Sequence, residues 1–361
     1  MGMFRLQKYL LWFLSLTGVM LFPNLLTTEQ VLRHRWYYFG YVIVVQSVFI
    51  SIGLTMLFIP FIMQFPVDLD KTSTFVLIVG YCHWHIILAS MAMHSVLNMK
   101  KLKSFYDILQ NIEDQSEPYL PRTLFGINLA MTVSIVLRFG ALFWVDSFPV
   151  LSLINWTNDA IQFAVFDLYN FHVICLVWSI RKHCNHLNSR LGDVLKFGSY
   201  QQIIDALRAT DSIYALLQAF NSYYGTFMLK MCMTVFVRSC LAFYFMFLAS
   251  RDWAFVIAVS VTLFMYTWWH CAVVCGMFSI CRSTTTVINE TVLSLRFFQE
   301  CNIVDSKITY QMNRFMLKTL HKQAAFRVSG CIDVNGKTIH LIFGSVITFL
   351  IILIQFKNLD D

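Results

Sequence analysis

The most constraining feature of this chain is a series of seven apolar segments, each long enough to cross a lipid bilayer as a helix. A spanning helix needs roughly 20 predominantly apolar residues. Only 13% of the residues are charged and 58% are hydrophobic, whereas soluble domains carry about 25% charged residues. We therefore predict an all-α, polytopic membrane protein with seven transmembrane helices, near residues 37–62, 74–98, 123–146, 151–180, 231–250, 253–281 and 338–356.

The basic residues indicate which way these helices cross the membrane. Lys and Arg concentrate in the cytosolic loops of membrane proteins. All but five of the 27 basic residues fall in one set of loops; the exceptions are Lys71, Arg251 and Lys357 on the other side, and Arg138 and Arg238 within spans. We therefore expect a cytosolic N-terminus and an extracellular C-terminus. The net charge of +7 comes from this loop distribution, so no nucleic-acid partner is expected.

The charge map also predicts the organisation of the chain. Residues 1–36 are expected to form a cytosolic segment whose apolar run 9–22 is an interfacial helix, and residues 37–361 the seven-helix domain. All six prolines lie in the first 149 residues, so the rest of the chain can form long helices that extend into the cytosol. The long inner segments 181–230 and 282–337 show helical spacing of apolar residues. That spacing predicts helices at 201–224 and 307–328.

The last apolar segment carries polar residues on one face. At about 100° per residue, Ser345, Thr348, Ile352 and Gln355 fall within an arc of roughly 80°. A carboxamide is costly in lipid unless it faces protein or water. If several copies of this helix surround an axis, Gln355 forms a polar ring. Ile352 then forms an apolar ring that can gate by dewetting.

The order of residues in this segment resembles the C-terminal signature of insect gustatory receptors, which is Thr-Tyr, five apolar residues, then Gln-Phe. The matching residues are Thr348, Gln355 and Phe356, whereas Phe349 stands where the family usually has tyrosine. Chain length, span count and polarity extend the resemblance over essentially the whole chain. The resemblance implies a ligand-gated, nonselective cation channel in the plasma membrane of gustatory neurons. It also implies a homo- or hetero-tetramer with related receptors, held together by the cytosolic ends of the later helices.

A candidate ligand pocket lies in the outer half of the predicted bundle. An aromatic-walled cavity with a few fixed polar groups suits a small molecule, and the gustatory resemblance places the tastant there. The candidates are Tyr81, Trp84, Arg138, Asn155, Asp159, Gln162, Tyr244, Phe264 and Tyr266. Asn155 also begins a glycosylation sequon at the membrane edge. Deeper in the spans, Asp167, His172 and Arg238 are read either as paired charges that fix helix register or as functional groups.

Other functions find less support in the sequence. No catalytic motif is present, and His83, His85, His183 and His186 lack further ligands at zinc spacing, so we expect no enzyme, metal or cofactor. A metabotropic seven-helix receptor would need the opposite charge map, and a solute transporter would favour pseudo-symmetric halves. The partners expected are membrane lipid and a small-molecule tastant. Bitter compounds, sugars, carbon dioxide and pheromones stay open, with the short chain and short outer loops favouring a bitter ligand or an orphan role.

Overall fold

The computed structural model describes residues 35–62, 71–113, 149–197, 200–249, 254–298, 306–320 and 324–360, together with residues 130 and 133. Within these ranges the chain is helical apart from one short antiparallel hairpin and its flanks, which confirms the predicted helical class. The elements are α3 (Arg35–Ile62), α4 (Lys71–Leu97), α5 (Met99–Glu113), α7 (Pro149–Phe197), α8 (Tyr200–Ala249), α9 (Ala254–Phe298), α10 (Ser306–Leu320), β1 (Arg327–Val328), β2 (Ile332–Asp333) and α11 (Gly336–Asp360).

Six of the seven predicted spans coincide with these helices. Four stretches are long and apolar enough to cross a membrane by themselves: Ile161–Leu191, Tyr200–Tyr244, Phe264–Thr291 and Gly336–Gln355. Two shorter apolar helical stretches, Tyr37–Ser51 and His85–Leu97, lie in α3 and α4. The predicted third span, 123–146, and the predicted interfacial helix, 9–22, lie outside the described residues except at positions 130 and 133.

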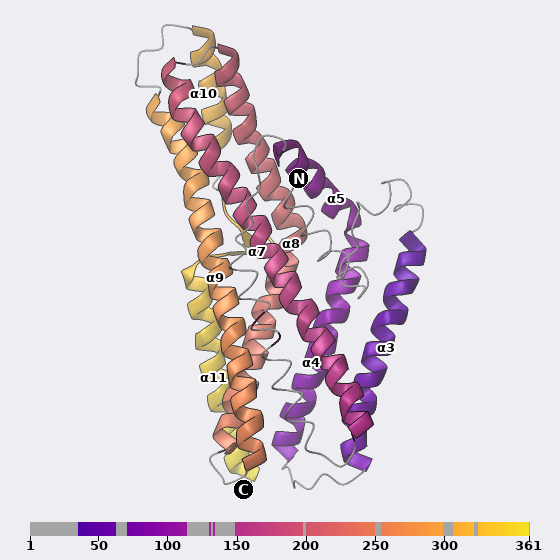
Figure 1. Cartoon of the computed structure of the whole chain (residues 1–361). Helices are drawn as coiled ribbons and strands as arrows, with labels where there is room; N and C mark the ends of the chain where they lie inside the picture. Colours follow the sequence, from indigo (N-terminus) through magenta and orange to yellow (C-terminus); the bar gives the residue numbers. More distant parts are fainter. Residues whose placement is uncertain are drawn as a thin grey trace.

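Three helices run the length of the molecule. The helices α7, α8 and α9 contain 49, 50 and 45 residues, or roughly 70 Å each at the helical rise. That length is more than twice the 30 Å thickness of a bilayer core. The predicted helix 201–224 and the predicted span 231–250 are therefore one continuous helix, α8. In Figure 1, α10 joins the three at one end of the molecule, and α11 lies at the other end, where the chain terminates.

One predicted helix is shorter than its sequence pattern indicated. The spacing from Phe315 to Phe326 predicted a helix over 307–328, but α10 ends at Leu320 and the chain then forms the hairpin of β1 and β2. Ser329 and Gly330 lie between the strands with φ of 48° and 75°, a left-handed conformation that glycine adopts readily. Phe326 and Val328 are buried, so the apolar pattern reflects packing of an extended segment against the bundle.

Aromatic side chains fill the core between α5, α7, α8 and α9. The Tyr106 hydroxyl lies 2.9 Å from His172 Nε2, and the Tyr224 hydroxyl lies 3.3 Å from the same nitrogen. Phe105 meets both Phe220 and Tyr224 edge to face. All five side chains are buried. His172, one of the deep polar residues of the sequence, thus lies within hydrogen-bond distance of two tyrosine hydroxyls. This contact supports the interpretation that His172 has a structural role.

The last helix packs against the bundle along one side only. It lies on α8 and touches α4 and α9 at its margins. Lys230 Nζ donates to the Ser90 carbonyl at 2.6 Å, and the Tyr223 hydroxyl donates to Ser95 Oγ at 3.2 Å, so α4 is also fixed to α8. The helix α8 therefore lies centrally, in contact with both α4 and α11.

Candidate functional site

The side of α11 that faces the bundle is an apolar stripe. Val346 and Leu353 are 1% and 8% exposed. Ile339 and Ile342 are partly buried against the main core, and Leu350 against the smaller cluster that contains Leu353. These residues recur every three or four positions, so at about 100° per residue they share one face. The described residues of this face thus pack against the neighbouring helices through apolar side chains.

The predicted polar face of α11 lies opposite this stripe. Ser345, Thr348, Ile352 and Gln355 are all exposed. Ser345 Oγ donates to the Leu341 carbonyl at 2.8 Å and Thr348 Oγ1 to the Gly344 carbonyl at 3.0 Å. These bonds within the helix satisfy both hydroxyls. Within the described part of the chain, no hydrogen-bond partner of the Gln355 amide is present.

The signature residues of this segment occupy different surroundings. The Phe349 ring is 42% exposed and lies 5.9 Å, centroid to centroid, from the ring of Phe236 on α8. A side chain that touches α8 while remaining partly exposed lies at the edge of the packed stripe. Phe356 belongs to α11, but its side chain is outside the described part of the structure.

A small apolar cluster joins α11 to α4 and α8. It consists of Val76, Leu241, Tyr244 and Leu353. Tyr244 was predicted from sequence to line the ligand pocket. The structure buries its side chain completely and places it in the cluster that contains Leu353 of α11. Tyr244 therefore lies at the apolar contact between α8 and α11.

Polar side chains from four helices converge inside the bundle. His270 Nδ1 on α9 lies 3.4 Å from Asp167 Oδ1 on α7, and both side chains are almost fully buried. On the neighbouring surfaces of α4 and α7, Gln162 Nε2 lies 3.4 Å from His85 Nδ1. Burying polar or ionisable side chains within a membrane costs free energy, and such side chains are usually found in contact with one another.

The guanidinium of Arg238 lies at the centre of this cluster. It is 5.6 Å from the centroid of the Phe163 ring and 5.5 Å from that of Tyr266, within the range of a cation–π contact. It is also close enough to interact electrostatically with His85 and His270. We call Gln162, Asp167, His85, Arg238, Tyr266 and His270 the buried polar cluster.

The structure places the predicted pocket residues in several different environments. Gln162 and Tyr266 belong to the buried polar cluster. Phe264 faces elsewhere, because its ring contacts Phe243 and Trp268, which are 40% and 67% exposed. Four further candidates lie on α4 or α7, but their side chains are not described: Tyr81, Trp84, Asn155 and Asp159. Arg138 lies outside the described residues.

Four members of the buried polar cluster were not predicted as ligand-site residues. Asp167 and Arg238 were singled out only as deep charges that either fix helix register or serve a function. His85 was considered only as a metal ligand, and His270 was not singled out. Both are ionisable side chains inside apolar stretches, which is the signal that identifies functional or structural polar sites in membranes. Among the described residues no group of three or more His, Cys, Asp or Glu side chains is placed to hold a metal ion.

Comparison with known proteins gives consistent matches. A family model described as 7tm Chemosensory receptor matches residues 7–359. The gustatory and pheromone receptor 32a of Drosophila melanogaster is 32% identical over 83 residues, which are 22% of this chain and 17% of that receptor.

Two solved structures show the fold. The olfactory receptor OR5 of Machilis hrabei matches with a TM-score of 0.65 at 13% identity, over 98% of both chains. The same receptor in complex with eugenol matches with a TM-score of 0.61 at 12% identity, over 96% of this chain and 97% of that one.

Proposed function

Because this chain belongs to the 7tm chemosensory receptor family, a family of multi-pass receptors of the plasma membrane, we propose that it is a gustatory receptor. We further propose that it works as a ligand-gated, nonselective cation channel. A small tastant binds among the helices of the bundle and opens a pore lined by α11. The observation that carries this proposal is the exposed polar face of α11, which lies opposite its packed stripe.

The polar face identifies α11 as the pore helix for an energetic reason. An amide exposed to lipid leaves its donors and acceptor without partners, which costs several kcal/mol (roughly 2–7). Four copies of the chain around an axis would turn Gln355 toward water instead. Ile352, one turn closer to the start of α11, would form an apolar ring that closes the pore by dewetting and opens when the helices separate.

The ligand site is proposed within the outer half of the bundle, next to the buried polar cluster. A related receptor fold has been solved with eugenol, which supports a small organic ligand. The path to the pore would follow α8. This helix carries Arg238 in the polar cluster and, one and two turns further on, Leu241 and Tyr244 against Leu353 of α11. A ligand that binds one arrangement of these helices more tightly shifts the population toward it.

The orientation and the domain boundaries belong to the same proposal. The N-terminus, with the segment 1–36, would be cytosolic and the C-terminus extracellular. The ends of α7 and α9, the start of α8, and α10 would then form the cytosolic anchor within 181–230 and 282–337. The exposed basic residues Arg327 and Lys337 would lie at the inner membrane surface, as the positive-inside rule requires.

Substitutions on two sides of α11 test the channel proposal without a known ligand. Ile352→Ala shortens the proposed apolar ring and should raise the ligand-free current at least tenfold, because a hydrated constriction conducts. Gln355→Glu should increase the permeability to divalent relative to monovalent cations. Ile347→Ala is the matched control, because Ile347 is 60% exposed but points about 140° away from Ile352. Planar-bilayer or patch recordings measure both quantities.

These recordings also separate the channel from its competitors. If Ile352→Ala and Gln355→Glu leave resting current and selectivity like those of the Ile347→Ala control in a conducting protein, α11 does not line the pore. If no variant conducts while the protein is folded at the cell surface, a metabotropic receptor becomes the better reading. Currents without unitary steps that saturate with solute would favour a transporter.

A further inference from the structure

The segment between α10 and α11 is attached to α8 by directed polar contacts. We call residues 324–335 the hairpin connection; they include β1 and β2. The side-chain amide of Asn221 on α8 donates from Nδ2 to the Ala325 carbonyl at 2.8 Å and accepts from the Arg327 backbone N–H at 2.9 Å. One amide thereby satisfies a donor and an acceptor of an extended strand, as a neighbouring β-strand would.

A second attachment lies one turn further along α8. The Ser329 backbone N–H donates to the Gly225 carbonyl at 3.0 Å. The Asn221 side chain and the Gly225 carbonyl therefore bind the same segment, at Ala325 and Arg327 and then at Ser329. A Cβ atom at position 225 would lie 2.6 Å from the Arg327 carbonyl oxygen and 3.2 Å from the Ser329 nitrogen. Only glycine allows the hairpin backbone to approach α8 this closely.

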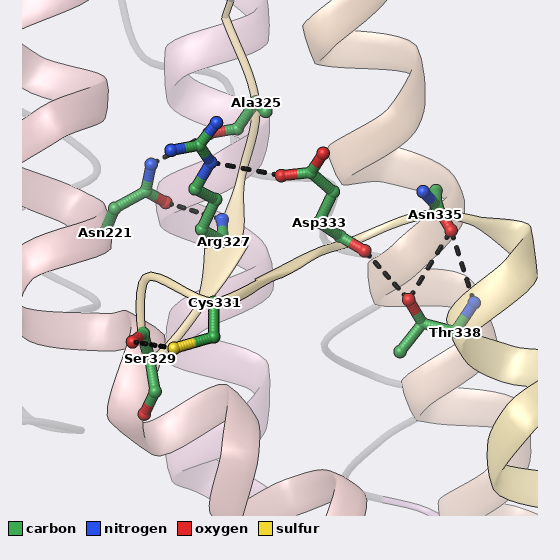
Figure 2. A network of polar contacts seen from close by, with 8 residues as sticks. All are labelled: Asn221, Ala325, Arg327, Ser329, Cys331, Asp333, Asn335 and Thr338. Carbon is green, nitrogen blue, oxygen red and sulfur yellow. Dashed lines mark hydrogen bonds and ion pairs between the residues drawn. The ribbon is translucent and has the colours of Figure 1, made fainter.

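The hairpin connection is equally well fixed to the first turn of α11. Asn335 caps this helix, because its Oδ1 accepts the Thr338 backbone N–H at 3.2 Å in the N-cap arrangement. Thr338 Oγ1 donates to the Asp333 carbonyl at 2.8 Å. Across the hairpin, Arg327 Nε donates to Asp333 Oδ1 at 3.1 Å. Figure 2 shows these contacts running without a break from Asn221 to Thr338.

The two ends of α11 are thus held by different kinds of contact. At its start, several hydrogen bonds fix it through the hairpin connection, whose buried side chains Phe326, Val328 and Val334 anchor in the main core. Beyond its first turns, α11 meets α8 through the apolar stripe, of which Val346 and Leu353 are the most buried residues. Directed hydrogen bonds fix geometry, whereas apolar contacts are non-directional and allow small sliding or tilting movements.

From this contrast we propose that Asn221 and Gly225 are positioning residues that make the hairpin connection the pivot of the pore helix. Movements of α11 occur about its first turn, and the far end, with Ile352 and Gln355, moves most. The inference rests on the proposed channel function, because it assigns a role in gating. It adds that the equilibrium between closed and open pores depends on residues outside the pore face.

Hydrogen exchange tests the attachment itself. Asn221→Ala removes two hydrogen bonds to the hairpin connection, so the backbone amides of residues 336–342 should exchange at least fivefold faster in the purified, detergent-solubilised full-length protein. Ser222→Ala is the control. Ser222 is exposed and lines the same open cavity, of about 1120 Å³, as Asn221, but no hydrogen bond from it to the hairpin is present in the described residues. Asn221→Asp keeps the acceptor for Arg327 and should give an intermediate rate.

Two glycine-to-alanine substitutions test the close approach of the hairpin backbone to α8. Gly225→Ala must displace the hairpin backbone, whereas Gly276→Ala on α9 meets no heavy atom within 4 Å. Both substitutions add the same methyl group to a helix and gain the same helix propensity. Only Gly225→Ala should accelerate exchange at the start of α11. Size-exclusion profiles and surface expression confirm that each variant is folded.

Single-channel recordings then distinguish a pivot from a merely structural attachment. In the Ile352→Ala background, which supplies ligand-free openings, Asn221→Ala and Gly225→Ala should change the open-to-closed ratio at least fivefold. They should leave cation selectivity unchanged, because they do not touch the pore face. Faster exchange with an unchanged open-to-closed ratio would overturn the pivot. So would exchange rates equal to those of the two controls.

The same measurements distinguish failure of the channel proposal from failure of the pivot proposal. If wild type and Ile352→Ala conduct no current although both are folded at the cell surface, the proposed function fails, and the gating role of Asn221 and Gly225 fails with it. The exchange rates would still show whether the hairpin connection fixes the start of α11. If current is present and only the positioning variants behave like their controls, the channel stands and the pivot alone is wrong.

Discussion

Single buried residues show how this bundle tolerates charge in an apolar interior. Asp167 and His270 face each other with side chains 2% and 1% exposed, and the Arg238 guanidinium lies over two aromatic rings nearby. Removing one member of such a group leaves the others buried without compensation, which costs more than the pair itself contributes. The deep polar residues of α7, α8 and α9 therefore depend on one another for compensation.

We expect Asp167→Ala to destabilise the protein by about 3 kcal/mol, within the range observed when one partner of a buried pair is removed. Thermal unfolding of the detergent-solubilised protein measures this effect. Asp205→Ala is the matched control, because Asp205 pairs with Arg208 at the surface, with both side chains more than half exposed. A surface pair contributes about 0–1 kcal/mol. Equal unfolding temperatures for the two variants would show that the Asp167 carboxylate is not a structural partner.

At the scale of elements, α11 differs from the other long helices because most of its surface is uncovered. Its packed stripe accounts for one side, and three different environments remain for the rest: water in a pore, lipid, or a neighbouring subunit. Exposure in a single chain does not separate these environments. Chemical reactivity does, because a thiol ionises in water and not in lipid.

A cysteine scan along α11 should therefore give a helical pattern. Ser345→Cys, Thr348→Cys and Gln355→Cys should react with a charged, membrane-impermeant thiol reagent and change the current. Val346→Cys is packed on the bundle and should not react. Ile347→Cys is the informative control, since Ile347 is 60% exposed yet lies about 100° from Thr348 on the helix. Reaction at Ile347 as fast as at Thr348 would mean that water surrounds α11 instead of filling a pore on one side of it.

At the scale of the whole molecule, three helices of roughly 70 Å must extend well beyond a bilayer on one side. We propose from the distribution of basic residues that this side is the cytosolic one. An N-terminal tag should then be inaccessible to antibody on intact cells, and a tag after Asp361 should be accessible. Permeabilised cells should stain for both. The reverse pattern would exclude the proposed orientation, and with it the channel reading that depends on a pore helix with an extracellular end.

Much of the architecture was determined by the sequence alone. Seven apolar segments require helices that cross a membrane, since each is long enough and few charges interrupt them. The absence of proline after residue 149 allows the uninterrupted helices α8 and α9. The polar face of α11 also follows from residue spacing, because angular position on a helix depends only on position in the sequence.

Other features were decided only by the tertiary structure. The sequence between α10 and α11 has helical spacing, yet it forms a hairpin because Asn221 and Gly225 on another helix provide its hydrogen bonds. The buried polar cluster joins side chains from four helices, and Tyr244 packs beside Leu353 instead of among the other pocket candidates. Contacts between residues distant in sequence depend on the relative positions of whole helices. Local spacing carries no information about those positions, and packing determines them.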